Sequence, residues 1–166
     1  LGLMYSDGNV SKKGNDITIR LLSKDKEVLQ QLSNYFYGQD RITIAENKRK
    51  QEIATFRICS KKLKQRLIEI GCPPNKTFIM KYPENLDPSL DRHFIRGVID
   101  GDGSVLDYTS PMISVTGTDE LLFGMGEIIE KKLNIKPTFE KTLDYRVRNV
   151  NISTMSYKGF LKLKIL

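Results

Sequence analysis

The spacing of apolar residues in the first half of the chain predicts strands and helices in a regular order. Residues 17–22 begin with alternating apolar and polar side chains, which is typical of a strand. Residues 23–38 carry apolar side chains three and four positions apart, so we expect an amphipathic helix with Ser23 as N-cap and Gly38 at its end. Two further strands, joined by a polar hairpin, are expected over 41–45 and 53–59.

The second half of the chain repeats this order of elements. The first half closes with a helix from Ser60 to Gly71, a proline-containing loop and a linker over 82–90. The elements expected in the second half are a strand over 112–116, a helix from 117, strands over 138–143 and 145–153, and a last helix over 153–161.

A repeated order at a nearly constant offset indicates an internal duplication. The triplet Ile58-Cys59-Ser60 matches Ile152-Ser153-Thr154, and we take these as corresponding positions. We therefore predict an α+β fold with antiparallel strands, built from two similar units over 1–88 and 89–166. On this alignment the second unit ends before the counterpart of the loop lysine Lys76.

Charge is concentrated in the first unit. The chain has a net charge of +7, and residues 41–66 alone contain nine basic and two acidic residues. A basic stretch of this kind can follow a phosphate backbone, although a solvated lysine-rich surface gives the same pattern. Two cysteines and one histidine are too few for a structural zinc site. No apolar run is long enough to span a membrane and no secretory leader is visible, so we expect an intracellular protein, in the cytoplasm, nucleoid or an organelle.

Two seven-residue segments share one frame. Residues 2–8 read GLMYSDG and residues 97–103 read GVIDGDG, so Asp7 and Asp102 each stand directly before a glycine. One Asp-Gly pair is an ordinary turn. The same acid at the same place in both units suggests that each unit contributes a carboxylate to a shared site.

These segments resemble the signature of the LAGLIDADG homing endonuclease family. Residues 94–105, FIRGVIDGDGSV, are a close match, whereas residues 1–10, LGLMYSDGNV, have Tyr5 in place of the first acid. The resemblance includes the element order and so covers nearly the whole chain. It implies two half-domains, each a curved antiparallel sheet with packed helices. The two motif helices would meet at an interface, where Gly2 and Gly97 allow close approach.

The resemblance also implies an active site. Asp7 and Asp102 would lie side by side over the two scissile phosphates and hold Mg²⁺ or Mn²⁺, with the backbone carbonyls of Ser6 and Gly101 as further ligands. Lys76 would lie near the phosphate and stabilise charge. The implied activity is metal-dependent hydrolysis of both DNA strands at a long recognition site.

Double-stranded DNA would be bound in its major groove by the two sheets. Alternation along the strands assigns the outward positions, and basic side chains in and near the first hairpin would contact phosphates. The DNA-contacting residues predicted in this way are Thr18, Arg20, Arg41, Lys48, Arg49, Lys50, Arg57, Ser114, Thr116, Arg146 and Arg148.

Two other functions use the same fold within this family. RNA maturases bind intron RNA and can keep both acids, so that alternative stays open. A third class has lost cleavage and acts as a DNA-binding regulator. Both acids, Asp7 and Asp102, are intact here, which argues against the regulator. Because two motifs lie in one chain, we expect a monomer.

Overall fold

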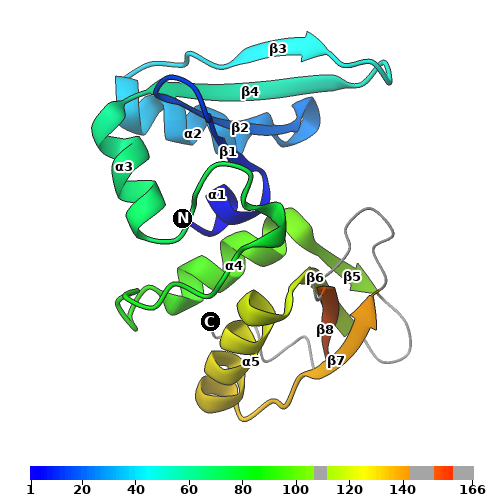
Figure 1. The fold of residues 1–166 in the computed structure, drawn as a ribbon. Helices are drawn as coiled ribbons and strands as arrows, with labels where there is room; N and C mark the ends of the chain where they lie inside the picture. Colours follow the sequence, from blue (N-terminus) through cyan, green and yellow to red (C-terminus); the bar gives the residue numbers. More distant parts are fainter. Residues whose placement is uncertain (107–111, 143–151, 159–166) are drawn as a thin grey trace.

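The computed structural model describes residues 1–106, 112–142 and 152–158, and it has an α+β fold with two antiparallel sheets of four strands (Figure 1). Both sheets have the same strand order. The first is β1 (Gly8–Val10), β2 (Asp16–Leu22), β4 (Glu52–Cys59) and β3 (Thr43–Glu46). The second is β5 (Gly103–Leu106), β6 (Met112–Thr118), β8 (Ile152–Lys158) and β7 (Thr138–Thr142).

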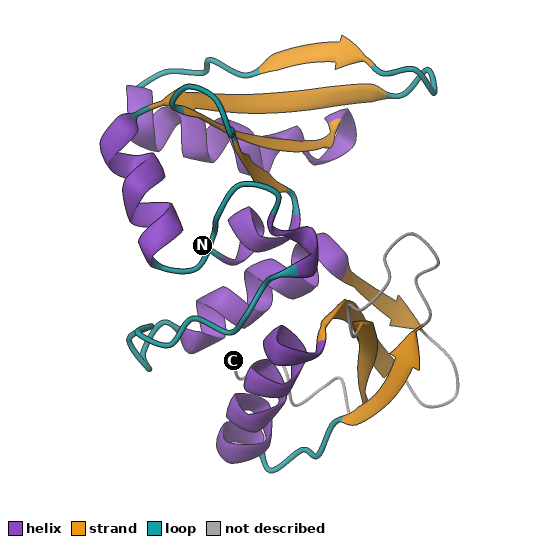
Figure 2. Cartoon of the chain, viewed as in Figure 1, coloured by secondary structure: helices purple, strands orange, loops and turns teal. Residues whose placement is uncertain are grey.

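The helices lie between and beside the two sheets (Figure 2). α1 (Gly2–Ser6) and α4 (Asp91–Asp102) contact each other in the middle of the molecule, and each runs directly into the first strand of a sheet. α2 (Lys26–Tyr37) packs on the first sheet and α5 (Asp119–Leu133) on the second, whereas α3 (Lys61–Glu69) follows β4 and runs away from the first sheet (Figure 1). No helix in the described ranges is both long and apolar enough to cross a bilayer.

Alternating burial along the strands separates a core face from an outer face. Ile17 and Ile19 of β2 are buried, as are Phe56 and Ile58 of β4. In the second sheet Ile113 and Val115 of β6 have the same role. The predicted parity of the strands is therefore confirmed, and it fixes which side chains each sheet presents outward.

Helix boundaries agree with the capping signals predicted at Ser60 and Gly38 and disagree with the one predicted at Ser23. The Ser60 hydroxyl accepts a hydrogen bond from the Leu63 amide at the start of α3, and Gly38 ends α2 in the left-handed conformation. Thr118 similarly caps α5. Ser23 is not an N-cap: it begins a 3₁₀ turn (Ser23–Asp25), and α2 starts at Lys26 with no side-chain cap.

The helix predicted over 153–161 is wrong, because β8 occupies Ile152–Lys158. Its backbone pairs with β6 on one side and β7 on the other, so these residues are a central strand. The strand predicted over 145–153 is likewise displaced; its residues 145–151 lie outside the described residues. In the first sheet Ile58 pairs with Ile17 of β2. At the corresponding place in the second sheet Ile113 of β6 pairs with Tyr157, which lies five residues beyond Ile152, the residue matched to Ile58 in the sequence. The triplet match therefore aligned the two units incorrectly at this strand.

Segment 79–90, which contains the predicted linker, has no helix or strand and connects the 3₁₀ turn Lys76–Phe78 to α4. The division of the chain into half-domains at residue 88 stays a prediction.

Candidate active site

The two motif helices touch through glycines. A Cβ atom added to Gly2 would lie 2.1 Å from the Phe94 carbonyl oxygen, and one added to Gly97 would lie 2.8 Å from the Leu3 nitrogen. Both obstacles are backbone atoms and cannot rotate away. Only glycine at these two positions allows α1 and α4 to approach this closely.

The two acids lie at the ends of these helices. Asp7 follows α1 directly, with its amide donating to the Leu3 carbonyl at 3.1 Å, and Asp102 is the last residue of α4. A Cβ atom on Gly101 would lie 2.4 Å from Oδ2 of Asp7. The side chain of Asp7 therefore lies against the backbone of the opposite motif, which brings one carboxylate from each unit to one place.

The Asp7 carboxylate is poorly satisfied by the surrounding protein. Its Oδ2 atom is buried and has no hydrogen-bond partner within the described residues. Burial raises the pKa of Asp7 above its ordinary value. Burial and then the neighbouring charge of Asp7 raise the pKa of Asp102, although that side chain stays accessible on its outer side. An anionic oxygen without a partner is costly, and a bound cation is the usual way to stabilise it.

Lys76 lies beside this pair. It begins the 3₁₀ turn after the Pro73-Pro74 loop, and only 7% of its surface is accessible. Its Nζ donates to the Ser6 carbonyl at 3.0 Å and also to the Tyr5 carbonyl. Burial lowers the pKa of Lys76, and the charges of Cys72, Asp102 and Asp7 oppose that shift. The ammonium thus binds the carbonyls at the C-terminal end of α1. Its charge opposes the effect of burial, which raises the pKa values of both acids.

This contact bears on the expected metal ligands. The Ser6 carbonyl already accepts from Lys76, so any cation there would share that oxygen with an ammonium group. The Gly101 carbonyl has no such contact among the hydrogen bonds of the described side chains. Within the described residues no three or more His, Cys, Asp or Glu side chains cluster as a metal site. The donor set offered by the side chains is therefore two carboxylates.

Two carboxylates suit a hard divalent cation that keeps water and phosphate oxygens as its other ligands. Mg²⁺ prefers oxygen ligands and is commonly bound through one or two carboxylates together with substrate phosphates. The unpartnered Oδ2 of Asp7 and the adjacent Asp102 fit that requirement. Within the described residues no histidine or cysteine joins them in a cluster that could hold a metal, and Cys72 is a buried free thiol whose pKa burial raises to about 11.

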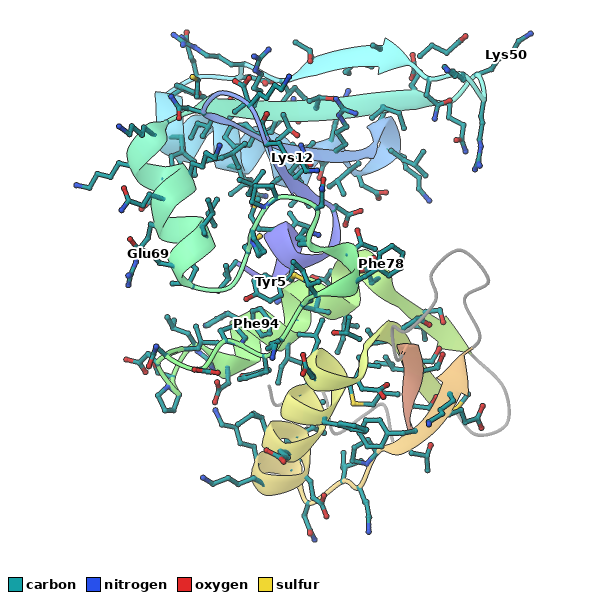
Figure 3. All side chains as sticks on the ribbon, viewed as in Figure 1. Tyr5, Lys12, Lys50, Glu69, Phe78 and Phe94 are labelled. Atoms are coloured by element: carbon teal, nitrogen blue, oxygen red, sulfur yellow. The ribbon has the colours of Figure 1, made fainter. Side chains whose placement is uncertain are left out.

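The remaining motif residues have structural contacts. The Tyr5 hydroxyl donates to the Ile70 carbonyl at 2.9 Å, and its ring meets Phe94 edge-on at 4.8 Å (Figure 3). Asp100, which holds the first acid position of the second motif, is exposed and pairs with Arg96 at 3.5 Å. Tyr5 therefore joins α1 to α3 and α4, whereas Asp100 is a surface residue.

A cleft of about 720 Å³ leads from Asp7 to the outer face of the first sheet. Arg20 and Thr55 line it on the sheet, and Asp100 and Gly101 line it on α4. The acid pair and the first sheet therefore share one open surface.

The predicted DNA-contacting residues of the first unit lie on or near this face. Thr18 and Arg57 are paired neighbours on β2 and β4, and Arg20 lies two residues along β2. Lys48, Arg49 and Lys50 are exposed in the β3–β4 turn, where Figure 3 shows Lys50 at the far tip. Arg41 instead lies over the Tyr37 ring, 4.8 Å from its centroid.

The outer face of the second sheet carries hydroxyl groups. Ser114 hydrogen-bonds Ser104 at 2.7 Å, and Thr116 bonds Thr154 at 3.1 Å. Ser104 and Thr154 are not among the predicted residues, and the parity of Thr154 could be assigned only once β8 was located. Arg146 and Arg148 lie outside the described residues.

Solved structures of LAGLIDADG proteins resemble this chain over almost its whole length. The N-terminal LAGLIDADG domain of DUF199/WhiA is 15% identical, covering 99% of this chain and 75% of that one, with a TM-score of 0.58. The meganuclease I-SmaMI, bound to an uncleaved DNA target in the presence of calcium ions, is 14% identical over 98% and 79%, with a TM-score of 0.58. The homing endonuclease I-DmoI, in complex with DNA and calcium, is 15% identical over 99% and 83%, with a TM-score of 0.57.

No protein-family model and no curated protein matches the chain. At identities this low the likeness establishes the fold alone. The predicted resemblance to LAGLIDADG homing endonucleases is thus confirmed for the fold, and the chemistry has to be argued from this chain's own residues.

Proposed function

We propose that this chain is a site-specific DNA endonuclease that hydrolyses phosphodiester bonds in both strands with the help of Mg²⁺ or Mn²⁺. The observation that carries the proposal is the Asp7 carboxylate, which lies at the contact of α1 and α4 with a buried, unpartnered oxygen. Asp102 from the other unit faces the same place. A site held this way costs stability in the free protein, which is typical of residues kept for chemistry.

Asp7 and Asp102 would hold the cation, with the Gly101 carbonyl as a further ligand and the Ser6 carbonyl shared with Lys76. Such a cation, when bound, stabilises negative charge on a phosphate and lowers the pKa of bound water. The two acids fix the position of that charge at the end of the cleft that leads to the first sheet. Because one chain supplies both acids, the monomer is the proposed active form.

Lys76 has two roles in this proposal. Its Nζ holds the Tyr5 and Ser6 carbonyls and so fixes the backbone that carries Asp7. Its positive charge, held in a buried position next to both acids, also stabilises the anionic form of the site.

Duplex DNA as the partner is supported by the arrangement of charge. Thr18, Arg20 and Arg57 project from one sheet face, and the basic turn at 48–50 extends from the end of the same sheet. Structures of I-SmaMI and I-DmoI with this fold contain DNA. A two-stranded antiparallel ribbon fits the major groove, where bases can be distinguished by their edges.

The proposal is tested with a plasmid library that carries a long randomised insert. Purified protein is incubated with the library and Mg²⁺, and linear products are sequenced. Enrichment of one insert family by the wild type, and no linear product with Asp7→Asn or Asp102→Asn, would support the endonuclease. Tight binding of intron RNA without cleavage of any insert would favour the maturase, and sequence-specific DNA binding without cleavage would favour the regulator.

A further inference from the structure

An aspartate holds one of the outward arginines of the first sheet in a fixed plane. Nε of Arg57 donates to Oδ1 of Asp16 at 3.0 Å, and Nη2 donates to Oδ2 at 2.8 Å. Two parallel bonds between a guanidinium and a carboxylate fix both distance and orientation. Asp16 begins β2, and Arg57 lies near the end of β4, so the pair joins two neighbouring strands.

The backbone below Arg57 is fixed as well. Arg57 pairs across the strands with Thr18. The backbone carbonyl of Arg57 accepts a hydrogen bond from the Tyr37 hydroxyl of α2 at 3.1 Å. Phe56 and Ile58 on either side of it are buried in the core. Arg57 therefore projects from a rigid part of the sheet rather than from a loop.

The guanidinium still has donors to offer. A guanidinium has five N–H groups, and Asp16 uses one on Nε and one on Nη2. The remaining edge, formed by Nη1 and the second hydrogen of Nη2, can donate two parallel bonds. The Arg57 side chain is 66% accessible, so that edge is open to a ligand. Guanine O6 and N7 in the major groove are the acceptor pair that an arginine edge matches.

We propose that Asp16 is a positioning residue that orients Arg57 to recognise one guanine in the major groove. This inference rests on the proposed binding of duplex DNA. It assigns different roles to the two arginines on this face, because Arg20 has no ion pair with any described carboxylate. Arg57 would specify a base, whereas Arg20, which no described carboxylate holds, would contribute charge.

Charge and orientation predict opposite results when Asp16 is neutralised. If the aspartate acts only through its charge, Asp16→Asn removes a repulsion and strengthens binding to every duplex equally. If it orients Arg57, the same change weakens the preference for guanine at one position. Asp25→Asn is the matched control, because Asp25 lines the cleft of the same sheet and does not contact Arg57.

The experiment selects bound sequences from a library of randomised duplexes in Ca²⁺, using the wild type, Asp16→Asn, Arg57→Lys and Asp25→Asn. Arg57→Lys keeps the charge but cannot donate two parallel bonds from one plane. We expect the wild type to prefer guanine at one position by about tenfold or more, as for a two-bond arginine contact. Asp16→Asn and Arg57→Lys should both reduce that preference at the same position, by roughly threefold or more, while Asp25→Asn leaves it unchanged.

Two failures are distinguishable. The inference is wrong, and the proposed function stands, if the wild type selects sequences and Asp16→Asn keeps every base preference. The same holds if Asp16→Asn keeps all the preferences that Arg57→Lys loses. If the wild type retains no duplex, the proposed function fails first. Circular dichroism melting of each variant shows that it is folded, and Arg57→Lys tests the guanine contact even if Asp16→Asn is unstable.

Discussion

Lys76 donates from Nζ to the Ser6 carbonyl at 3.0 Å, one residue before Asp7, so a buried ammonium closes the end of the helix that carries the acid. Seventy positions separate the two residues in the chain. The contact makes the geometry of the first motif depend on the loop after α3. It also sets a positive charge beside two carboxylates that burial makes harder to ionise.

Lys76→Met is expected to weaken both the fold and the activity. Two helix-end carbonyls lose their donor, which costs about 1–3 kcal/mol of unfolding free energy. Loss of the ammonium removes a cause that lowers the pKa of Asp7 and of Asp102, so both values rise further. We expect cleavage to fall by about a hundredfold and its acidic limb to move to higher pH.

Urea melts and a pH–rate profile measure these effects, and Lys62→Met is the matched control because Lys62 is exposed on α3. A variant that is less stable but keeps the wild-type pH profile would leave Lys76 with a structural role only.

Asp7→Asn is expected to stabilise the free protein at neutral pH while abolishing cleavage. The native pKa of Asp7 is raised above its ordinary value of 3.8, so between these two values the native state binds more protons than the unfolded state. Stability therefore falls as the pH rises through that window, and the loss persists at pH 7. Neutralising the side chain removes this penalty, so the Tm measured at pH 7 should rise above that of the wild type.

Thermal melts of wild type and Asp7→Asn without metal, at pH 3 and pH 7, measure the difference. The gain should be present at pH 7 and smaller at pH 3, where the wild-type carboxyl is protonated in both states. A variant that is less stable than the wild type at pH 7 would show that the charged form of Asp7 is satisfied in the free protein.

Gly97→Ala is expected to separate the two motif helices. The new Cβ would meet backbone atoms of Leu3 and Gly2 at 2.8 and 3.0 Å, and neither can move without shifting α1. Overpacking of this kind costs about 1–3 kcal/mol. Since both acids are positioned by this contact, cleavage should fall more than stability alone explains, at temperatures where the variant is fully folded.

Gly117→Ala provides the control, because its added Cβ would have only ordinary contacts from 3.5 Å onward. Equal Tm losses in the two variants would mean that the α1–α4 contact is not the tight point of the fold. Full cleavage activity in folded Gly97→Ala would mean that the acids do not depend on it.

The fold was predictable as far as local patterns reach. Alternation identified the core faces of β2, β4 and β6, and the helix opening predicted at Ser60 is the observed start of α3. The strand β8 was missed because a match of three residues set the alignment of the two units, whereas pairing with β6 and β7 decides that element. The pairing with β6 joins residues some forty positions apart and leaves no local signature.

The site shows the same division between local and long-range information. The repeated Asp-Gly frame predicted Asp7 and Asp102 as a pair, because in each motif the acid and the glycine are adjacent in the sequence. The contact of Lys76 with the end of α1, and that of Asp16 with Arg57, depend on side chains from distant segments. No spacing in the sequence indicates them.

The central claim is that Asp7 and Asp102 form one metal-dependent site that serves both DNA strands. The most direct measurement is strand-resolved cleavage of a duplex carrying a selected target, with a different label on each strand, in Mg²⁺ and in EDTA. We predict that the wild type cuts both strands only with Mg²⁺, and that Asp7→Asn and Asp102→Asn each lose roughly a thousandfold or more on both strands. Double-strand cleavage at the wild-type rate by either single variant, or by the wild type in EDTA, would contradict the claim.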